Sequence, residues 1–167
     1  MYLFPASQTS KTKTLKLLNI FVIFLVMISC KGVQKEKTEQ SRKRIEGTWR
    51  LITGTLIEKG DTTVTHYTDS ISFIKIINQT HFAFLQHDLN KGKDSAAVFV
   101  AGGGSYSLRD DQYTEHLEYC SAREWEGNDF VFTVTFSGDT LVQKGIEKVE
   151  GAGINRINIE KYVTALR

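Results

Sequence analysis

Residues 130–136 read FVFTVTF, and this short stretch indicates how the chain folds. Large apolar side chains occupy every second position, which is the period of a β-strand with one face turned toward a core. The clusters Gly127-Asn128-Asp129 and Ser137-Gly138-Asp139 flank the stretch. Because Gly, Asn and Asp accept the backbone angles of tight turns, the sequence predicts one strand between two sharp reversals.

The same pattern extends outward from this strand through the chain from Ile45 onward. No stretch of ten or more residues keeps the i, i+3, i+4 spacing of an amphipathic helix. Short turn-forming clusters separate the segments, so consecutive strands are expected to be antiparallel neighbours. The predicted strands are Thr48–Glu58, Ser70–Ile77, His81–His87, Ala96–Ala101, Ser105–Leu108, Tyr113–Cys120, Phe130–Phe136, Thr140–Val149 and Asn155–Thr164.

The predicted fold class is therefore all-β, an antiparallel up-and-down β-barrel of about eight to nine strands. A sandwich is the alternative, but a Greek key needs a long return connection, and nearly every link here is hairpin-short. Closure into a barrel also removes exposed strand edges. A small barrel either fills its lumen with side chains or leaves room for one small ligand, and the sequence leaves both outcomes open.

The N-terminal segment predicts export from the cytoplasm. Residues 17–28, LLNIFVIFLVMI, follow three lysines and are shorter than the roughly 20 residues of a membrane-spanning helix. They match the apolar region of a secretory signal. Ser29-Cys30 comes directly afterward and resembles the lipobox of bacterial lipoproteins, which implies a signal peptide over 1–29 and lipidation at Cys30. An uncleaved anchor, or a buried Cys near a secretory cleavage site, is the alternative.

Residues 30–44, CKGVQKEKTEQSRKR, are predicted to be a charged flexible tether, because they hold too little apolar surface to offset the entropy of ordering. A short helix ending near Arg44 is the competing interpretation. The tether has six basic and two acidic residues, whereas residues 45–167 have 12 basic and 17 acidic residues. An acidic folded part argues against nucleic-acid binding. The basic tether suits an anionic membrane surface, and Lys31 after the cysteine fits lipoprotein sorting to an outer membrane.

Residues 46–51, EGTWRL, place Gly47 and Trp49 as G-x-W at the start of the first long strand. This resembles the first signature of lipocalins and related calycin barrels. The stretches 75–84, 102–108 and 113–119 (KIINQTHFAF, GGGSYSL and YTEHLEY) are similar to a lipocalin-like domain family of uncharacterised Gram-negative lipoproteins. The resemblance covers about residues 45–163, and it implies a calycin-type barrel over 45–167 and an expectation of ligand binding.

The resemblance also implies how one end of the barrel closes. In lipocalins the G-x-W tryptophan lies there, and a basic side chain of the last strand stacks on it, a cation–π contact. Lys161 and Arg156 are the residues available for this role, and Tyr162 stands where relatives often carry a tryptophan.

The candidate ligand-binding residues are mostly aromatic side chains on strand faces that closure would turn inward. Glu115 shares a face with Tyr113, Leu117 and Tyr119 and is expected to be a polar anchor for a small, largely apolar ligand. The alternative is a structural hydrogen bond from Glu115 to a tyrosine hydroxyl or to a neighbouring backbone. The candidates are Phe73, Phe82, Phe84, Phe99, Tyr106, Tyr113, Glu115, Tyr119, Phe132 and Phe136.

Other motifs predict no chemistry. Gly102-Gly103-Gly104 lacks the Lys-Ser or Lys-Thr of a phosphate loop, so a strand bend, a bulge or a close backbone approach is expected. His116 and Glu118, with His66, His81 or His87, lack metal-site spacing. Cys120 is expected to be a buried, unreactive thiol. We therefore expect no enzyme activity, no cofactor and no metal; the alternative to ligand binding is a structural or protein-interaction lipoprotein with a filled barrel.

Overall fold

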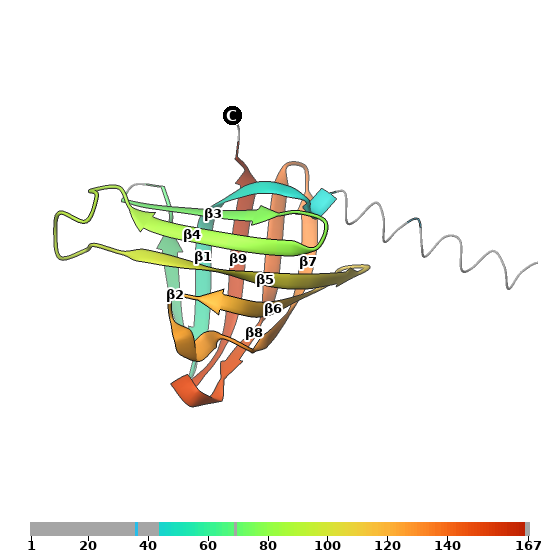
Figure 1. Cartoon of the computed structure of the whole chain (residues 1–167). Coiled ribbons are helices and arrows are strands. Elements are labelled where there is room, and N and C mark those ends of the chain that lie inside the picture. Colours follow the sequence, from blue (N-terminus) through green and yellow to red (C-terminus); the bar gives the residue numbers. More distant parts are fainter. Residues whose placement is uncertain (1–35, 37–43, 69, 166–167) are drawn as a thin grey trace, which may run out of the picture. The chain divides into compact units, whose positions relative to one another are not determined.

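Antiparallel β-strands make up most of the computed structural model, which describes residues 36, 44–68 and 70–165 (Figure 1). Within these residues the strands form one antiparallel sheet, with two short 3₁₀ turns named η1 and η2. In chain order the elements are β1 (Gly47–Glu58), β2 (Asp61–His66), β3 (Ile71–Ile77), β4 (His81–Asp88), β5 (Phe99–Arg109), β6 (Gln112–Cys120), η1 (Arg123–Trp125), β7 (Asp129–Ser137), β8 (Thr140–Val149), η2 (Glu150–Ala152) and β9 (Ile154–Thr164).

The sheet closes on itself through β1. One edge of β1 pairs with β9 from Trp49 to Ile57, and the other edge pairs first with β3 and then with β2. Among the described residues, β1 and β3 to β9 therefore form a closed eight-stranded barrel, and β2 is an extra strand beside it. In Figure 1, β3 to β6 cross in front of β1, β7, β8 and β9. The predicted all-β antiparallel barrel is confirmed.

Two strand predictions were wrong. β2, with the sequence DTTVTH, was not predicted, because it is exposed nearly throughout and has no buried face to produce an apolar alternation. The separate strands predicted on either side of Gly102-Gly103-Gly104 are one continuous strand, β5, which begins at Phe99. The predicted bounds of β8, Thr140–Val149, match the structure.

The Trp49 end of the barrel is closed by residues that precede β1. Ile45 is fully buried, and its carbonyl accepts a 2.7 Å hydrogen bond from Trp49 Nε1. The Trp49 ring packs on Phe136 with 6.2 Å between centroids, and the Arg44 guanidinium lies 4.4 Å from the Phe136 centroid. Arg44 therefore contacts the barrel, so the predicted tether stops short of it.

The sequence left open which residue covers Trp49, and neither of the two basic residues available, Lys161 and Arg156, takes this role. Lys161 is exposed, and Arg156 stacks on another tryptophan, Trp125, at 5.3 Å from its centroid. Ile157 to Thr164 of β9 run alongside β1, with Thr164 opposite Trp49. Arg156 precedes this paired stretch and lies near the opposite end of the barrel.

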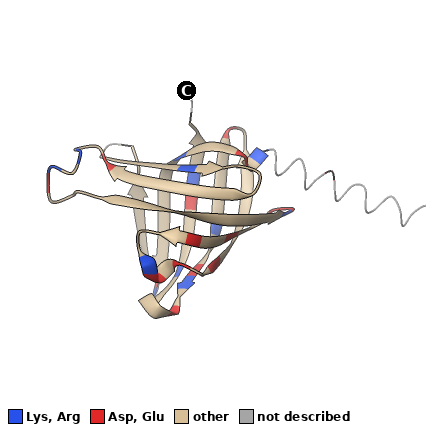
Figure 2. Cartoon of the chain, viewed as in Figure 1, with Lys and Arg blue, Asp and Glu red and all other residues tan. Residues whose placement is uncertain are grey.

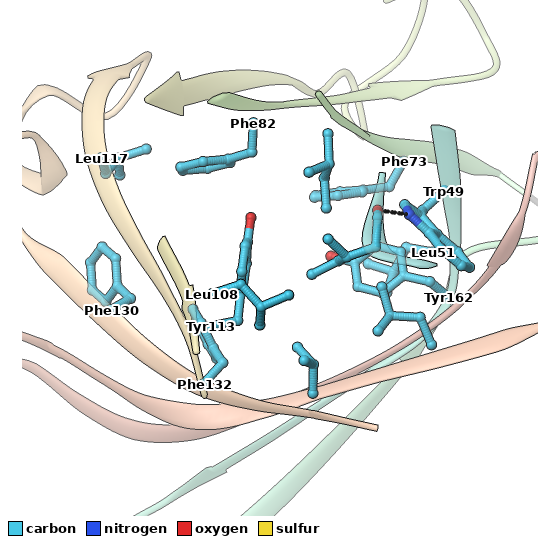
Figure 3. Packing of buried hydrophobic residues seen from close by; sticks show 14 of the residues in the cluster. Trp49, Leu51, Phe73, Phe82, Leu108, Tyr113, Leu117, Phe130, Phe132 and Tyr162 are labelled. Atoms are coloured by element: carbon cyan, nitrogen blue, oxygen red, sulfur yellow. Dashed lines mark hydrogen bonds between the residues drawn. The ribbon is translucent and has the colours of Figure 1, made fainter. Parts of the chain in front are cut away.

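Apolar side chains fill the Trp49 half of the barrel (Figure 3). Leu51, Leu108, Leu141 and Tyr162 are at most 1% exposed. The turns between β3 and β4, β5 and β6, and β7 and β8 lie at this end. The connections 89–98 and 121–128, together with η2, lie at the other, which we call the η1 end. The tightly packed apolar core therefore occupies the Trp49 half of the barrel, and the η1 half has different contents.

Within the described residues, the structure contains no helix with the length and apolar character needed to cross a membrane. The predicted signal peptide, the lipidation site Cys30 and all of the tether except Glu36 and Arg44 lie outside the described residues.

Candidate functional site

A cavity of about 330 Å³, partly open to solvent, lies inside the η1 half of the barrel. Its volume is at the lower end of the range for small-molecule sites in proteins. The barrel is therefore neither solid throughout nor hollow throughout, since the Trp49 half is packed and the η1 half is not. The side chains that surround the cavity fall into an apolar wall and a polar wall.

Strands β3, β4, β6 and β7 supply the apolar wall. Phe73 and Phe84 stack with nearly parallel rings, 5.8 Å between centroids and 9° between planes. Leu117, Phe130 and Phe132 line the cavity as well, and Figure 3 shows these three side chains pointing inward from β6 and β7. Such a wall suits the apolar body of a ligand.

Gly102 in β5 makes the position of Phe84 possible. Gly102 and Phe84 are direct partners across β4 and β5, and a Cβ at Gly102 would overlap the Phe84 ring and lie 2.8 Å from the Tyr119 carbonyl oxygen. Of the alternatives expected for the three glycines, the close backbone approach is confirmed, whereas the extra residue of the bulge is Glu118 of the facing strand β6. The glycines therefore shape the cavity by letting an aromatic ring lie flat over the strand.

Strands β8 and β9 supply most of the polar wall. Their facing residues pair as Gln143 with Glu160 and Glu147 with Arg156, and Asn158 lies between them opposite Gly145. All five polar side chains line the cavity. Figure 2 shows that charged positions occur within the strands as well as in the loops. The cavity is therefore more polar than the predicted largely apolar pocket.

Lys75 of β3 is the centre of this polar wall. Its side chain is 3% exposed and donates to Glu115 Oε1 at 2.8 Å and to Gln143 Oε1 at 3.1 Å. Glu160 Oε2 lies 3.7 Å away. Glu115 therefore turns inward as predicted, and it has a close partner that the sequence analysis did not consider, the Lys75 ammonium at 2.8 Å.

The buried charges shift one another's protonation. Burial alone would lower the pKa of Lys75, but the nearby carboxylates of Glu115 and Glu160 outweigh burial and raise that pKa. Burial raises the pKa of Glu115, and the ammonium of Lys75 opposes this shift. Lys75 and Glu115 thus form a buried ion pair in which each group stabilises the charged form of the other.

A second ion pair lies nearer the η1 end. Arg156 Nε donates to Glu147 Oε2 and Asn158 Nδ2 donates to Glu147 Oε1, both at 2.7 Å. Burial raises the pKa of Glu147, the charge of Glu160 adds to this, and the bonds from Arg156 and Asn158 oppose it. Arg156 also stacks on Trp125, which packs on Phe130 with 5.7 Å between centroids. Both carboxylate oxygens of Glu147 are therefore occupied.

Two buried polar atoms of the described residues have no hydrogen-bond partner, the Tyr113 hydroxyl and Gln143 Nε2. Tyr113 is fully buried, and its hydroxyl points into the barrel in Figure 3. Gln143 is 1% exposed and lines the cavity. Leaving a buried donor unsatisfied costs about 1–3 kcal/mol, so these atoms mark a place where the barrel lacks a polar partner.

The structure brings only part of the predicted site together. Phe73, Phe84, Glu115 and Phe132 line the cavity. Phe82 and Tyr113 are buried in the adjoining core, whereas Phe136 lies under Trp49 at the closed end. The Tyr106 hydroxyl donates to the Asn78 carbonyl at 2.7 Å, so its polar end is engaged outside the cavity wall.

The inward placement predicted for Phe99 and Tyr119 was wrong, since both side chains are 69% exposed. The register between β5 and β6 shifts by one residue, with Gly103 opposite Tyr119 and Gly104 opposite Leu117. This bulge at Glu118 reverses the alternation, so Cys120 faces the cavity in place of Tyr119. Phe99 begins β5 directly after the connection 89–98.

The residues weighed as metal ligands have other contacts in the structure. His116 Nδ1 lies 2.6 Å from Asp129 Oδ1 on the outer surface. Glu118 Oε1 accepts from the backbone amide of Ser105. Within the part of the chain that the structure describes, no group of three or more His, Cys, Asp or Glu residues could hold a metal ion. Cys120 is buried, as predicted, and its side chain contributes to the cavity wall.

The sequence reasoning missed Lys75, Gln143, Glu147, Asn158 and Glu160. Their signal was present, because each lies in phase with a buried apolar residue of its own strand, such as Lys75 between Phe73 and Ile77. Comparison with known proteins adds no further assignment: no protein-family model matches the chain, and no curated protein matches it.

Proposed function

We propose that the protein is a lipid-anchored binding protein of the cell envelope whose lipocalin-like barrel holds a small molecule with a largely apolar body. The observation that carries the proposal is the cavity of about 330 Å³ inside a barrel whose other half is packed. That volume is at the lower end of the range for sites that bind small molecules. The ligand is therefore a compact molecule rather than a peptide or a folded partner.

The side chains around the cavity support a binding role. A stacked aromatic pair, Phe73 and Phe84, faces strands that carry a few fixed polar groups. Apolar walls with a small number of oriented polar groups are typical of small-ligand sites, since the walls provide affinity and the polar groups provide orientation. The polar groups are held by hydrogen bonds and ion pairs of 2.7–3.1 Å, so little ordering remains to be done on binding.

The proposed location depends on the sequence alone. The signal-like segment 17–28, Cys30 in its lipobox-like context and the basic tether 30–44 support an anchor in the outer membrane of a Gram-negative bacterium. Mass spectrometry of the purified full chain tests both proposals at once. We expect diacylglycerol and an acyl chain at Cys30, and a retained small molecule released on denaturation.

A stability measurement tests binding separately. A ligand that binds only the native state at 100 times its dissociation constant stabilises it by about 2.7 kcal/mol. We therefore expect the urea midpoint of the full chain to rise with a hydrophobic extract. Ala122→Phe, which places a ring at the cavity wall, should reduce this rise. Ala101→Phe is the matched control, since Ala101 is paired with the exposed Leu85 on the outer surface.

A second candidate function is protein interaction, and one surface favours it. Ile76, Leu85, Phe99 and Tyr119 are exposed and lie on the outer face of the adjacent strands β3 to β6. Exposed apolar patches of this kind mark interaction sites on soluble domains. An unchanged urea midpoint with every extract, together with a partner crosslinked through this face, would favour the second candidate over small-molecule binding.

A further inference from the structure

The charges that line the cavity do not balance. Among the described residues that line it, three carboxylates, from Glu115, Glu147 and Glu160, face only two cationic groups, from Lys75 and Arg156. Lys75 and Glu115 form one close pair at 2.8 Å, and Arg156 and Glu147 form another at 2.7 Å. Glu160 is the remaining carboxylate, so with all five groups ionised the cavity has one excess negative charge.

Glu160 is held in place but is not neutralised by a close partner of its own. Its Oε2 accepts a 2.8 Å hydrogen bond from the Tyr162 hydroxyl, and the Lys75 ammonium lies 3.7 Å away. Its side chain is 14% exposed and lines the cavity, so a ligand can reach it. A largely buried anion without a full counter-charge is costly, and this cost falls when a cation binds beside it.

An unsatisfied hydrogen-bond donor lies next to this carboxylate. Gln143 is directly opposite Glu160 in the β8–β9 pairing, so the two side chains share one face of neighbouring strands. Gln143 Oε1 accepts from Lys75, which leaves Nε2 on the other side of the amide without an acceptor. This second observation is independent of the charge count, and it calls for a hydrogen-bond acceptor on the ligand.

From these contacts we infer that the cavity selects a protonated amine that carries a hydroxyl or carbonyl oxygen close to its nitrogen and an aromatic or apolar body. The ammonium binds the Glu160 carboxylate, the oxygen accepts from Gln143 Nε2, and the body packs on Phe73 and Phe84. Aromatic rings favour a nearby ammonium through the cation–π interaction. The inference depends on the proposed small-molecule function and specifies the class of ligand.

An anionic ligand fits these residues less well. The Lys75 ammonium already contacts Glu115 and Gln143, with Glu160 close by. The Arg156 guanidinium bonds Glu147 and covers the Trp125 ring. A carboxylate or phosphate ligand would have to displace one of these partners while approaching an excess negative charge, and like charges brought together in a buried site oppose binding.

Isothermal titration calorimetry of the full chain with four matched probes tests the inference. 2-Amino-1-phenylethanol carries the ammonium and the hydroxyl, and 2-phenylethylamine lacks the hydroxyl. 1-Phenyl-1,2-ethanediol is the neutral analogue, and mandelate is the anion. We expect the affinity to fall in the order in which these four probes are named, with at least tenfold between the amino alcohol and the diol.

Glu160→Gln keeps an acceptor for Tyr162 and removes the excess charge. We expect this variant to bind 2-amino-1-phenylethanol at least tenfold more weakly and the diol with unchanged affinity. Glu124→Gln is the control, because Glu124 is an exposed carboxylate on η1 and the substitution changes the net charge equally. Since the probe series on the unmodified chain measures charge preference by itself, the inference stays testable if Glu160→Gln does not fold.

Three outcomes separate this inference from the proposed function. Preference for the amines that is lost in Glu160→Gln supports both. Equal or tighter binding of the diol or mandelate overturns the amine inference and leaves a small-molecule site. Both the amine inference and the proposed function are overturned if three results coincide. The chain then binds none of the four probes, does not bind neutral N-phenyl-1-naphthylamine, and retains no small molecule in native mass spectrometry.

Discussion

Lys75→Met tests whether the polar wall is an interdependent electrostatic unit. The Lys75 and Glu115 side chains are 3% and 7% exposed and lie 2.8 Å apart, so removing the ammonium leaves a buried carboxylate without its counter-charge. Breaking a buried ion pair in this way typically costs about 3–5 kcal/mol. That is a large part of the roughly 5–15 kcal/mol by which domains are stable, so we expect the urea midpoint to fall steeply.

The pH dependence of this loss has a defined sign. Burial raises the pKa of Glu115 above its ordinary value of 4.5, and without Lys75 that pKa rises further. An acid whose folded pKa exceeds its unfolded pKa binds more protons when folded, so stability increases as pH falls through the folded value. We therefore expect the cost of Lys75→Met to be largest near pH 8 and to shrink toward pH 5.

Two further variants complete the test. In Lys75→Met/Glu115→Gln no carboxylate remains at position 115, so the double variant should be more stable than Lys75→Met alone. Lys148→Met removes an ion pair of the same 2.8 Å length whose partners are 60% and 83% exposed, and it should change stability little. A cost for Lys75→Met below about 1 kcal/mol at pH 8, or one that does not vary with pH, would refute the reasoning.

Three other predictions concern packing and alkaline stability. Gly102→Ala should lower the free energy of unfolding by about 1–3 kcal/mol and displace Phe84, since the added Cβ overlaps the Phe84 ring. Gly151→Ala is the control and should be neutral, because a Cβ there meets nothing within 4 Å. Urea unfolding of both variants measures the difference. Phe82→Ala should cost about 3–5 kcal/mol because Phe82 is 3% exposed, and Phe99→Ala, at 69% exposed, should stay within about 0.5 kcal/mol; equal losses in chemical denaturation would contradict these placements. Burial raises the pKa of Tyr113 and Tyr162 above the ordinary 10.0, and nearby carboxylates raise that of Lys75 above 10.5, so stability present below these values should be lost as pH increases beyond about 10, measured as a falling thermal midpoint.

The barrel could be predicted from the sequence because most of its strands bury one face. β7 alternates large apolar residues with exposed ones, and the bounds of β8 follow from the turn residues on either side of it. β2 has no such alternation, since it lies beside the closed barrel and all of its residues except Thr65 are exposed. Alternation detects burial on one face, and it therefore misses a strand that is held by backbone pairing to β1.

The site was harder to predict for two physical reasons. The bulge at Glu118 turns the Tyr119 side chain to the outer face. This extra residue in β6 is defined by the pairing with Gly103 and Gly104 of β5, so it cannot be recognised from the sequence of β6 alone. The rest of the polar wall was missed because, apart from Glu115, polar residues in phase with a buried face were not predicted to be buried. The partners that hold Lys75 in its buried position are distant in the sequence: Glu115 is 40 residues away and Gln143 is 68 residues away.

The two halves of the barrel differ in what they contribute. Leu51, Leu108 and Leu141 fill the Trp49 half in the way that stabilises a small barrel most simply. Buried ion pairs rarely stabilise a protein more than well-packed apolar side chains do, so the charges in the η1 half are poorly explained by stability alone. The proposed ligand recognition accounts for them, because fixed charges discriminate between molecules of equal size. Substitutions in the Trp49 half should therefore change the free energy of unfolding and leave the preference for amine probes intact. Glu160→Gln should change the preference for amine probes and have a smaller effect on the free energy of unfolding. One panel of variants thus measures stability and ligand preference separately.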